Sequence, residues 1–443
     1  MSSYWLERAW LGDDQVVDGV LVTVEDGRFA SVQPGATAPP PGVRRLPGLT
    51  IPGLANCHSH AFHRALRGRT QDGHGTFWSW RDLMYDVAER LDPDGYHALA
   101  RAAFREMAAA GITTVGEFHY LHHDRGGRRY ANPNAMGLAV VEAARDVGIR
   151  VALLDTCYLA AGIGSPPEGV QRRFSDGDAE GWACRVDDLT AAVRDRDGVV
   201  VGAAVHSVRA VPREQVGTVV GWAADRPLHV HVSEQPAENE AALASYGLTP
   251  TQLLAEEGAL GPLTTAVHAT HLTERDIGLL GDSRTTVCAC PTTERDLGDG
   301  TGPFGRLRDA GAPVTVGSDS HAVVDLLEEL RAVELDERLV TQQRGHWSAA
   351  ELLAAGSRDG HRSLGFPDAG RIEVGARADL VTIDTASPRT AGTGAGSATV
   401  VFAATAADVT HVVVDGRVVS DGSDRADVGR ELDRAIGAVW EGR

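Results

Sequence analysis

The middle of the chain repeats one pattern, a short apolar run followed by a stretch rich in Ala, Leu, Glu and Arg. This alternation is typical of βα units, in which each buried strand is followed by a helix that covers the sheet. Eight parallel strands within residues 51–369 predict an α/β fold, a (β/α)8 TIM barrel enlarged by loop insertions. The eight apolar runs are residues 49–54, 113–118, 151–157, 199–205, 228–232, 265–269, 285–289 and 313–317.

Polar residues follow nearly every one of these runs, which favours the barrel over a doubly wound sheet. A doubly wound sheet gathers its functional residues near one switch point. In a barrel the carboxyl ends of all the strands converge on one rim, so residues far apart in the sequence become neighbours. The residues expected at this rim include His58, His60, Tyr120, His206, Arg209, His231, Glu234, His268 and Asp319.

The two ends of the chain have a different pattern, an alternation of apolar and polar residues between Gly and Asp turns. It is clearest in residues 19–27, 378–384 and 411–419. Period-two alternation of this kind predicts antiparallel strands. Because both β-rich ends flank the barrel, we expect one small β-sandwich domain built from residues 1–50 and 370–443.

Composition and charge exclude several classes of protein. The apolar content of 43% suits a large globular core, and no apolar stretch is long enough to span a membrane. The N-terminus lacks the pattern of a secretory signal, and five scattered Cys residues fit reduced thiols, so we expect a cytoplasmic protein. The net charge of -19 argues against nucleic acid and anionic membranes as partners.

All 42 basic residues are Arg, since the chain contains no Lys. This excludes a Schiff base on Lys, a P-loop lysine and a carbamylated Lys that bridges two metal ions.

A group of potential metal ligands lies among the rim residues. His58 and His60 are two positions apart at a strand end, so both side chains point the same way. His231 at the fifth strand and Asp319 at the eighth supply a third imidazole and a carboxylate. Three nitrogen ligands and one oxygen ligand suit Zn²⁺, with Fe²⁺ or another divalent ion as alternatives. Without Lys, and with His206 after the fourth strand, we expect one metal ion.

The catalytic roles follow from the charge of that ion. A bound divalent metal lowers the pKa of its water and makes water a nucleophile near neutral pH. Glu234, three residues after His231, is placed to protonate a substrate nitrogen or shuttle a proton. His268 is placed to polarise the nucleophile, and Asp319 to take the proton of the water and pass it to a leaving amine. A surface carboxylate and a structural histidine are the alternatives for Glu234 and His268.

The segments around these residues resemble a known family. Residues 52–60, PGLANCHSH, are similar to the first-strand motif of the amidohydrolase superfamily, and the His231–Glu234 spacing resembles its deaminase branch. Closer still, four longer segments resemble the formimidoylglutamate deiminases of histidine degradation. These segments are HSHAFHRA (58–65), FWSWRDLMY (77–85), EFHYLHHD (117–124) and HSVRA (206–210), and the shorter QRRF (171–174) resembles them too.

The resemblance implies a substrate and residues that bind it. The activity would convert N-formimino-L-glutamate and water to N-formyl-L-glutamate and ammonia. Arg81 and Arg209, with Tyr120 and His206, would hold the two carboxylates of this small dicarboxylate, since Arg offers a planar fork for carboxylate oxygens. Many members of the family pair as dimers, which adds a homodimer to the expectations. The alternatives are a helix-surface arginine for Arg81 and a salt bridge in the barrel rim for Arg209.

His63 departs from the family pattern, in which this position is usually Gln. If His63 contacts the substrate, a related N-formimino amino acid such as formimino-aspartate is an alternative. A deaminase of a nucleobase or other heterocycle is a second one, and it predicts an apolar or aromatic slot with amide contacts and not two rim arginines. A non-catalytic barrel is the third, although such relatives normally lose metal ligands and here all four are present.

Overall fold

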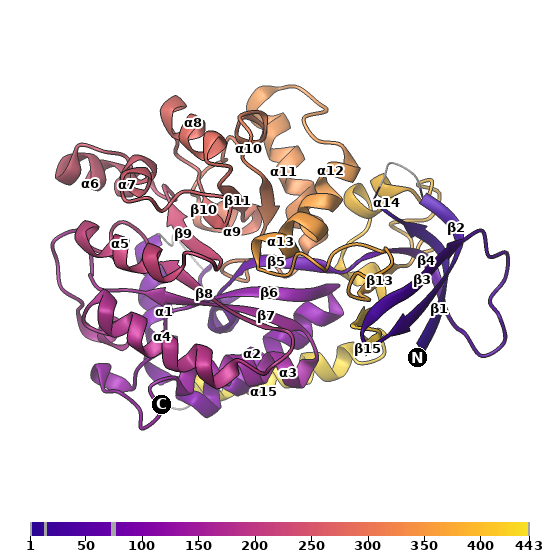
Figure 1. Cartoon of the computed structure of the whole chain (residues 1–443), viewed down its shortest axis with the longest axis horizontal. Coiled ribbons are helices and arrows are strands. Elements are labelled where there is room, and N and C mark those ends of the chain that lie inside the picture. Colours follow the sequence, from indigo (N-terminus) through magenta and orange to yellow (C-terminus); the bar gives the residue numbers. More distant parts are fainter. Residues whose placement is uncertain (1, 13–15, 72–76, 442–443) are drawn as a thin grey trace.

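The computed structural model describes residues 2–12, 16–71 and 77–441, in which the strands form two sheets (Figure 1). The larger sheet has eight parallel strands that follow one another in chain order, which confirms the predicted barrel. The strands are β5 (Leu54–Ser59), β6 (Ile112–His119), β7 (Arg150–Cys157), β8 (Val199–Val205), β9 (Leu228–Val232), β10 (Thr264–His268), β11 (Thr286–Ala289) and β12 (Val314–Val316).

The last strand returns to the first, and this contact nearly closes the barrel. Ser59 and Asp319 form an isolated parallel bridge, with hydrogen bonds from Asp319 N to His58 O (2.9 Å) and from His60 N to Asp319 O (3.2 Å). Gly317 permits the close approach, since a Cβ there would lie 2.7 Å from the Cβ of His58. The closure therefore joins the two segments that contain three of the predicted metal ligands.

The prediction of residues 49–54 as the first barrel strand is wrong. Most of this run belongs to β4 (Arg44–Pro52) of the other sheet, and the barrel begins with β5, which includes His58. The break falls at Gly53, where a Cβ would lie 2.3 Å from Thr113 Oγ1. An apolar run shows that two strands are buried, but it does not show where the chain passes from one sheet to the next. The other seven strands agree with the predicted runs to within two residues.

Helices cover the outside of the barrel, and several begin with a side-chain cap. Asp92, Asp178 and Thr249 each accept a hydrogen bond from a backbone N–H in the first turn of the helix that follows. The helices after the first four strands include α1 (Phe77–Arg90), α2 (Pro93–Ala109), α3 (Ala135–Val147), α4 (Ala179–Val193) and α5 (Arg213–Trp222). Those after the last four are α6 (Pro236–Tyr246), α7 (Pro250–Glu256), α8 (Glu274–Asp282), α9 (Pro291–Leu297), α10 (Phe304–Asp309), α11 (Leu326–Thr341), α12 (Ala349–Ala354) and α13 (Gly360–Ser363).

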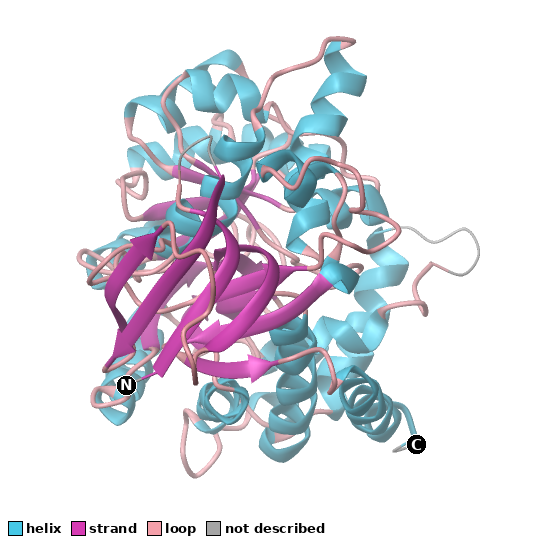
Figure 2. Cartoon of the chain, turned by 90° about the vertical axis from the view of Figure 1, so that its right-hand side faces the viewer, coloured by secondary structure: helices cyan, strands magenta, loops and turns pink. Residues whose placement is uncertain are grey.

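The second sheet is a mixed sheet built from both ends of the chain, as the sequence predicts (Figure 2). Its strands form one continuous sheet and not the two stacked sheets of the predicted sandwich, because alternation identifies strands without fixing how they are divided between sheets. In spatial order they are β15 (Arg417–Ser420), β14 (Val409–Val414), β13 (Leu380–Ile383), β4, β1 (Ser2–Trp10), β2 (Val16–Glu25) and β3 (Arg28–Pro34).

The C-terminal helix α15 (Arg425–Glu441) leaves this sheet and runs along α2 of the barrel (Figure 1). Arg105 Nη1 donates to Glu431 Oε2 (2.5 Å), and Arg101 binds the other oxygen of the same carboxylate. The expected β domain of residues 370–443 therefore includes a helix that packs on the barrel. A short helix, α14 (Ser397–Phe402), precedes β14.

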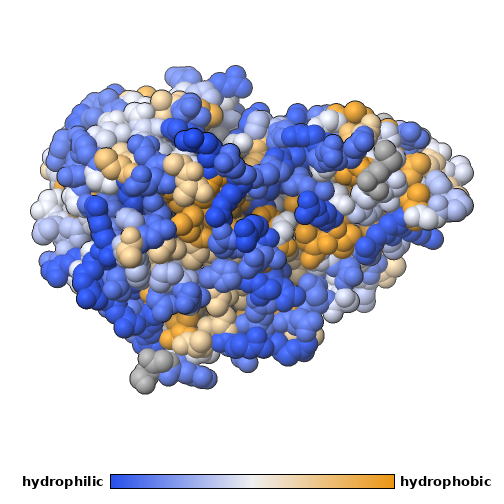
Figure 3. All heavy atoms as spheres, turned by 60° about the horizontal axis from the view of Figure 1, so that its bottom comes forward, coloured by the Kyte–Doolittle hydropathy of each residue, from blue (hydrophilic) through white to orange (hydrophobic). Residues whose placement is uncertain are grey.

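The surface seen in Figure 3 is mostly hydrophilic, with several smaller apolar areas between charged side chains. Among the described helices, none combines the length and the apolar character needed to cross a bilayer.

A buried ion pair joins the barrel to the second sheet. Arg150, at the start of β7, donates to Asp379 and, over 3.0 Å, to Asp415 Oδ1. Both Arg150 and Asp379 are almost completely buried, and Asp379 also accepts the backbone N–H of Asp415 (3.0 Å). The two β-rich ends of the chain are thus held on the barrel by a charge pair that water does not reach.

Arg150→Met should lower the free energy of unfolding by about 3–5 kcal/mol, because it leaves the Asp379 carboxylate buried without its cation. Denaturant unfolding of the purified proteins measures this, and adding Asp379→Asn should recover part of the loss. Arg8→Met, which removes an exposed pair with Asp18, is the control and should change stability by about 1 kcal/mol or less. Equal stability of Arg150→Met and wild type would contradict this role.

Candidate active site

Strand β5 places His58 and His60 on the same side of the chain, and the residue between them anchors the strand. Ser59 Oγ donates to Glu117 Oε2 (2.6 Å) and lies 2.9 Å from His321 Nε2. The other Glu117 oxygen accepts the backbone N–H of Ala61 (2.6 Å). Burial raises the pKa of Glu117 to about 7, although these hydrogen bonds oppose the shift. Hydrogen bonds at Ser59 and Ala61 thus hold the segment that contains the two histidines.

The four predicted metal ligands converge at the rim. Asp319 Oδ1 lies 3.2 Å from His58 Nε2 and 3.3 Å from His60 Nε2, and His231 Nε2 lies 3.1 Å from His58 Nε2. Ligand atoms around a tetrahedral ion with bonds of about 2.1 Å are separated by about 3.4 Å. The observed separations are therefore close to those around one common ion.

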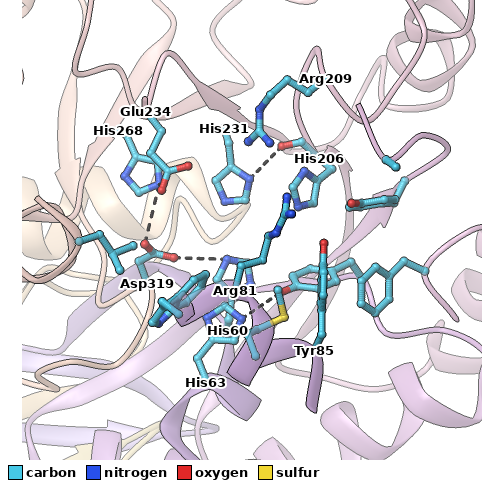
Figure 4. Close-up of a pocket in the computed structure, with 17 residues that line it drawn as sticks. His60, His63, Arg81, Tyr85, His206, Arg209, His231, Glu234, His268 and Asp319 are labelled. Atoms are coloured by element: carbon cyan, nitrogen blue, oxygen red, sulfur yellow. Dashed lines mark hydrogen bonds and ion pairs between the residues drawn. The ribbon is translucent and has the colours of Figure 1, made fainter. Parts of the chain in front are cut away.

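His268 lies beside the same group. One ligand atom from each of His58, His231, His268 and Asp319 forms a set in which all atoms are within 4.8 Å of one another. His268 Nε2 is 3.8 Å from Asp319 Oδ2, whereas His58 and His60 both approach Asp319 Oδ1. His268 therefore faces the second oxygen of Asp319 (Figure 4), which fits a contact with a reacting group better than a place among the nearest ligands.

Backbone carbonyls orient two of the imidazoles. His60 Nδ1 lies 3.0 Å from Phe118 O, and His231 Nδ1 lies 2.8 Å from His206 O. A carbonyl only accepts hydrogen bonds, so Nδ1 is protonated in both rings and the Nε2 lone pair remains for a metal. Burial lowers the pKa of His58 to about 4 and lowers that of His231 well below its usual value. The rings of His58 and His231 are thus neutral, as metal ligands must be.

Several rim residues have a backbone conformation that side chains rarely adopt. The φ angles of Ser233, His268 and Asp319 are 51°, 67° and 37°. Such strain costs about 1–3 kcal/mol per residue and is common at functional sites. Burial favours the neutral acid at Asp319, but the adjacent His58 and His60 imidazoles outweigh burial and hold its pKa well below the usual range.

Glu234 and Glu294 lie near opposite nitrogens of the His268 ring. Glu234 Oε1 is 3.9 Å from His268 Nε2, and Glu294 Oε1 is 3.4 Å from Nδ1. Burial alone would lower the pKa of His268, but the nearby carboxylates raise it well above the usual value. Glu294 is expected at the rim from its place after the seventh strand, but no role is predicted for it, and the structure places it in α9, just after β11.

The predicted substrate-binding residues line a pocket above this cluster (Figure 4). His63 Nε2 lies 2.8 Å from the Tyr120 hydroxyl, and the guanidinium groups of Arg81 and Arg209 point into the pocket. Arg209 Nε is 3.6 Å from the buried carboxylate of Glu238. The predicted residues in the wall are His63, Arg81, Tyr120, His206 and Arg209, together with His60, His231, Glu234, His268 and Asp319.

The wall has an aromatic part to which no substrate contact was assigned from the sequence. Tyr85, Tyr158 and Phe174 line the pocket, and Trp80 and Met84 lie next to Arg81 and Tyr85 in α1. The spacing of Arg81 and Tyr85 indicates that Tyr85 lies in the wall, because residues four positions apart lie on one side of a helix.

A second group of potential ligands, His119, His122 and Asp155, lies outside the pocket. Both Asp155 oxygens accept hydrogen bonds from Arg185, over 2.9 and 2.8 Å, and Trp182 Nε1 donates to one of them (3.0 Å). A guanidinium in this position repels a divalent cation, so the group is better described as a buried ion-pair network.

Comparison with known proteins agrees with this geometry. The sequence model of the amidohydrolase family matches residues 49–419. The chain is 36% identical to formimidoylglutamate deiminase of Pseudomonas aeruginosa over 95% of both chains, and 28% identical to 5-methylthioadenosine/S-adenosylhomocysteine deaminase of Pelotomaculum thermopropionicum over 93% of this chain and 90% of that protein. The crystal structure of an amidohydrolase from Brucella melitensis superposes with a TM-score of 0.91 at 30% identity, covering 99% of this chain and all of that one. The chain therefore belongs to the amidohydrolase family.

Proposed function

We propose that this chain hydrolyses N-formimino-L-glutamate to N-formyl-L-glutamate and ammonia, a step of histidine degradation. The observation that supports this most directly is a pocket with a cluster of metal ligands at its base and two arginines, Arg81 and Arg209, that point into it. The likeness to a formimidoylglutamate deiminase along nearly the whole chain supports the same reaction.

His58, His60, His231 and Asp319 are suited to hold one divalent ion, with Zn²⁺ favoured by three nitrogen donors and one oxygen donor. Such an ion, when bound, polarises the formimino group and makes water a nucleophile near neutral pH. A carbamylated Lys, which holds a second ion in some barrels, is excluded because the chain has no Lys.

The neighbouring residues move the protons. Water adds its oxygen to the formimino carbon, and Asp319 accepts one proton from the water while His268 holds the oxygen by a hydrogen bond. Glu234 protonates the nitrogen that remains attached to glutamate. The proton held by Asp319 then passes to the terminal nitrogen, and the bond from carbon to that nitrogen breaks, so that ammonia leaves. The remaining hydroxyl proton returns to Glu234 as the formyl C=O forms. Both protons of the water are thus used, one on each nitrogen.

Arg81 and Arg209 bind the two carboxylates, with Tyr120, His206 and His63 as further contacts. Burial lowers the pKa of His206 well below its usual value, and Arg209 adds to the shift, so His206 contacts the substrate as a neutral ring. A charged substrate held from two sides positions the formimino carbon over the metal ligands.

Glu234→Gln should lower kcat for ammonia release from N-formimino-L-glutamate by about 10²–10⁴-fold, because the amide cannot deliver a proton. Metal content, measured by elemental analysis, should be unchanged. Glu240→Gln, at an exposed position of α6, which follows Glu234, is the control and should retain wild-type kcat. An active Glu234→Gln protein would show that another group delivers the proton.

Arg209→Ala should raise KM for N-formimino-L-glutamate by about 10–100-fold with a smaller change in kcat, because it removes a charge-assisted hydrogen bond to a carboxylate. Steady-state kinetics measures both constants, with Arg194→Ala, at an exposed position, as the control. An unchanged KM would count against the assigned contact.

The same assay tests the alternatives. A heterocycle deaminase would release ammonia from adenosine or guanine derivatives and not from N-formimino-L-glutamate. N-formimino-L-aspartate is a second candidate substrate, because His63 contacts Tyr120 in the pocket wall. Faster turnover of this compound than of N-formimino-L-glutamate would favour it.

A further inference from the structure

A buried amide in the loop after β7 contacts two tyrosines of the pocket wall. Gln171 lies in a short 3-10 helix, η3 (Gly169–Arg173), and is 6% exposed. Its Nε2 lies 2.9 Å from the hydroxyl of Tyr85 and 3.1 Å from that of Tyr158. The tyrosines come from α1 and from the end of β7, so one side chain joins two separate parts of the wall.

The start of η3 fixes which way this amide points. Gln171 Oε1 accepts the backbone N–H of Glu168 (3.0 Å) as part of a capping box, so Nε2 faces the tyrosines and donates to both. A hydroxyl that accepts a hydrogen bond still has its own proton to donate. The two hydroxyls also interact with each other, which uses at most one of these protons. At least one O–H donor is therefore left for a ligand.

The ring of His206 lies between Tyr158 and the metal ligands, and in Figure 4 Tyr85 lies across the pocket from Asp319 and His268. The ring of Tyr158 is 4.6 Å from that of His206, which is itself 5.1 Å from the ligand His231. The Arg81 guanidinium lies 5.5 Å from the Tyr85 ring, and in Figure 4 it and the Tyr85 hydroxyl point toward the same part of the pocket. Burial raises the pKa of Tyr158, so this hydroxyl stays protonated beside an anion.

We propose that Tyr85 and Tyr158, held by Gln171, form with Arg81 a specificity site for the γ-carboxylate of the substrate. This inference rests on the proposed function and adds to it the group that recognises the end of the substrate farther from the formimino carbon. A site built from buried donors strongly rejects an analogue that lacks the matching acceptor, because the donors are then left unpaired.

The first test compares N-formimino-L-glutamate with N-formimino-L-norvaline, which has no γ-carboxylate, and with N-formimino-L-glutamine. Wild type should prefer the glutamate compound by about 100-fold or more in kcat/KM. Tyr85→Phe and Tyr158→Phe should each raise KM for the glutamate compound about tenfold, leave kcat within about twofold, and reduce the preference.

Gln171→Glu is the sharper test. A carboxylate at this position still accepts the N–H of Glu168, but it also accepts the tyrosine protons that the amide leaves for the substrate. KM for N-formimino-L-glutamate should rise about tenfold or more. The double variant with Tyr158→Phe should have nearly the same KM as Gln171→Glu alone. Gln343→Glu, at an exposed position, controls for the added charge and should leave KM unchanged.

Thermal melting and calorimetric binding of N-formyl-L-glutamate accompany the kinetics and show whether each variant is folded. If one tyrosine variant does not fold, the other decides the question. Folded tyrosine variants with wild-type KM and wild-type preference would overturn this inference alone. A wild-type protein that releases no ammonia from N-formimino-L-glutamate would instead overturn the proposed function, and the inference with it.

Discussion

The return of β12 to β5 is the contact on which the site depends. Two backbone hydrogen bonds, between Asp319 N and His58 O and between His60 N and Asp319 O, join the first and last parts of the barrel. The same residues supply three of the four potential metal ligands, and Gly317 lets the two segments approach closely enough. The closure that completes the fold thus also sets the distances between the ligand atoms.

The residues around this closure restrict the site to one arrangement. Glu117 and His321 hold Ser59 between His58 and His60, and backbone carbonyls leave Nε2 of His60 and His231 available for a metal. The positive φ angles at the rim cost free energy that the buried core must offset. The strained backbone, the buried side chains and the fixed histidine tautomers indicate that the site is organised before any ligand binds.

The sequence predicted the barrel because each strand is a short apolar run followed by polar residues, a local pattern. The structure places the predicted ligands and His268 together, while their chemical roles stay predictions. The boundary at Gly53 could not be predicted, since the neighbours that require glycine there, Thr113 and Asp379, are distant in sequence. The roles of Glu294, expected at the rim, and of Gln171, part of a family-like segment, could not be predicted for a related reason, because each acts through another side chain.

X-ray absorption spectroscopy and elemental analysis of the purified protein test the central claim most directly. The account predicts one divalent ion per chain, with three nitrogen ligands at about 2.0–2.1 Å and a carboxylate oxygen at about 2.0–2.2 Å. His58→Asn should lose that ion. A protein that binds no divalent metal, or that keeps the same coordination after His58 is replaced, would contradict the account.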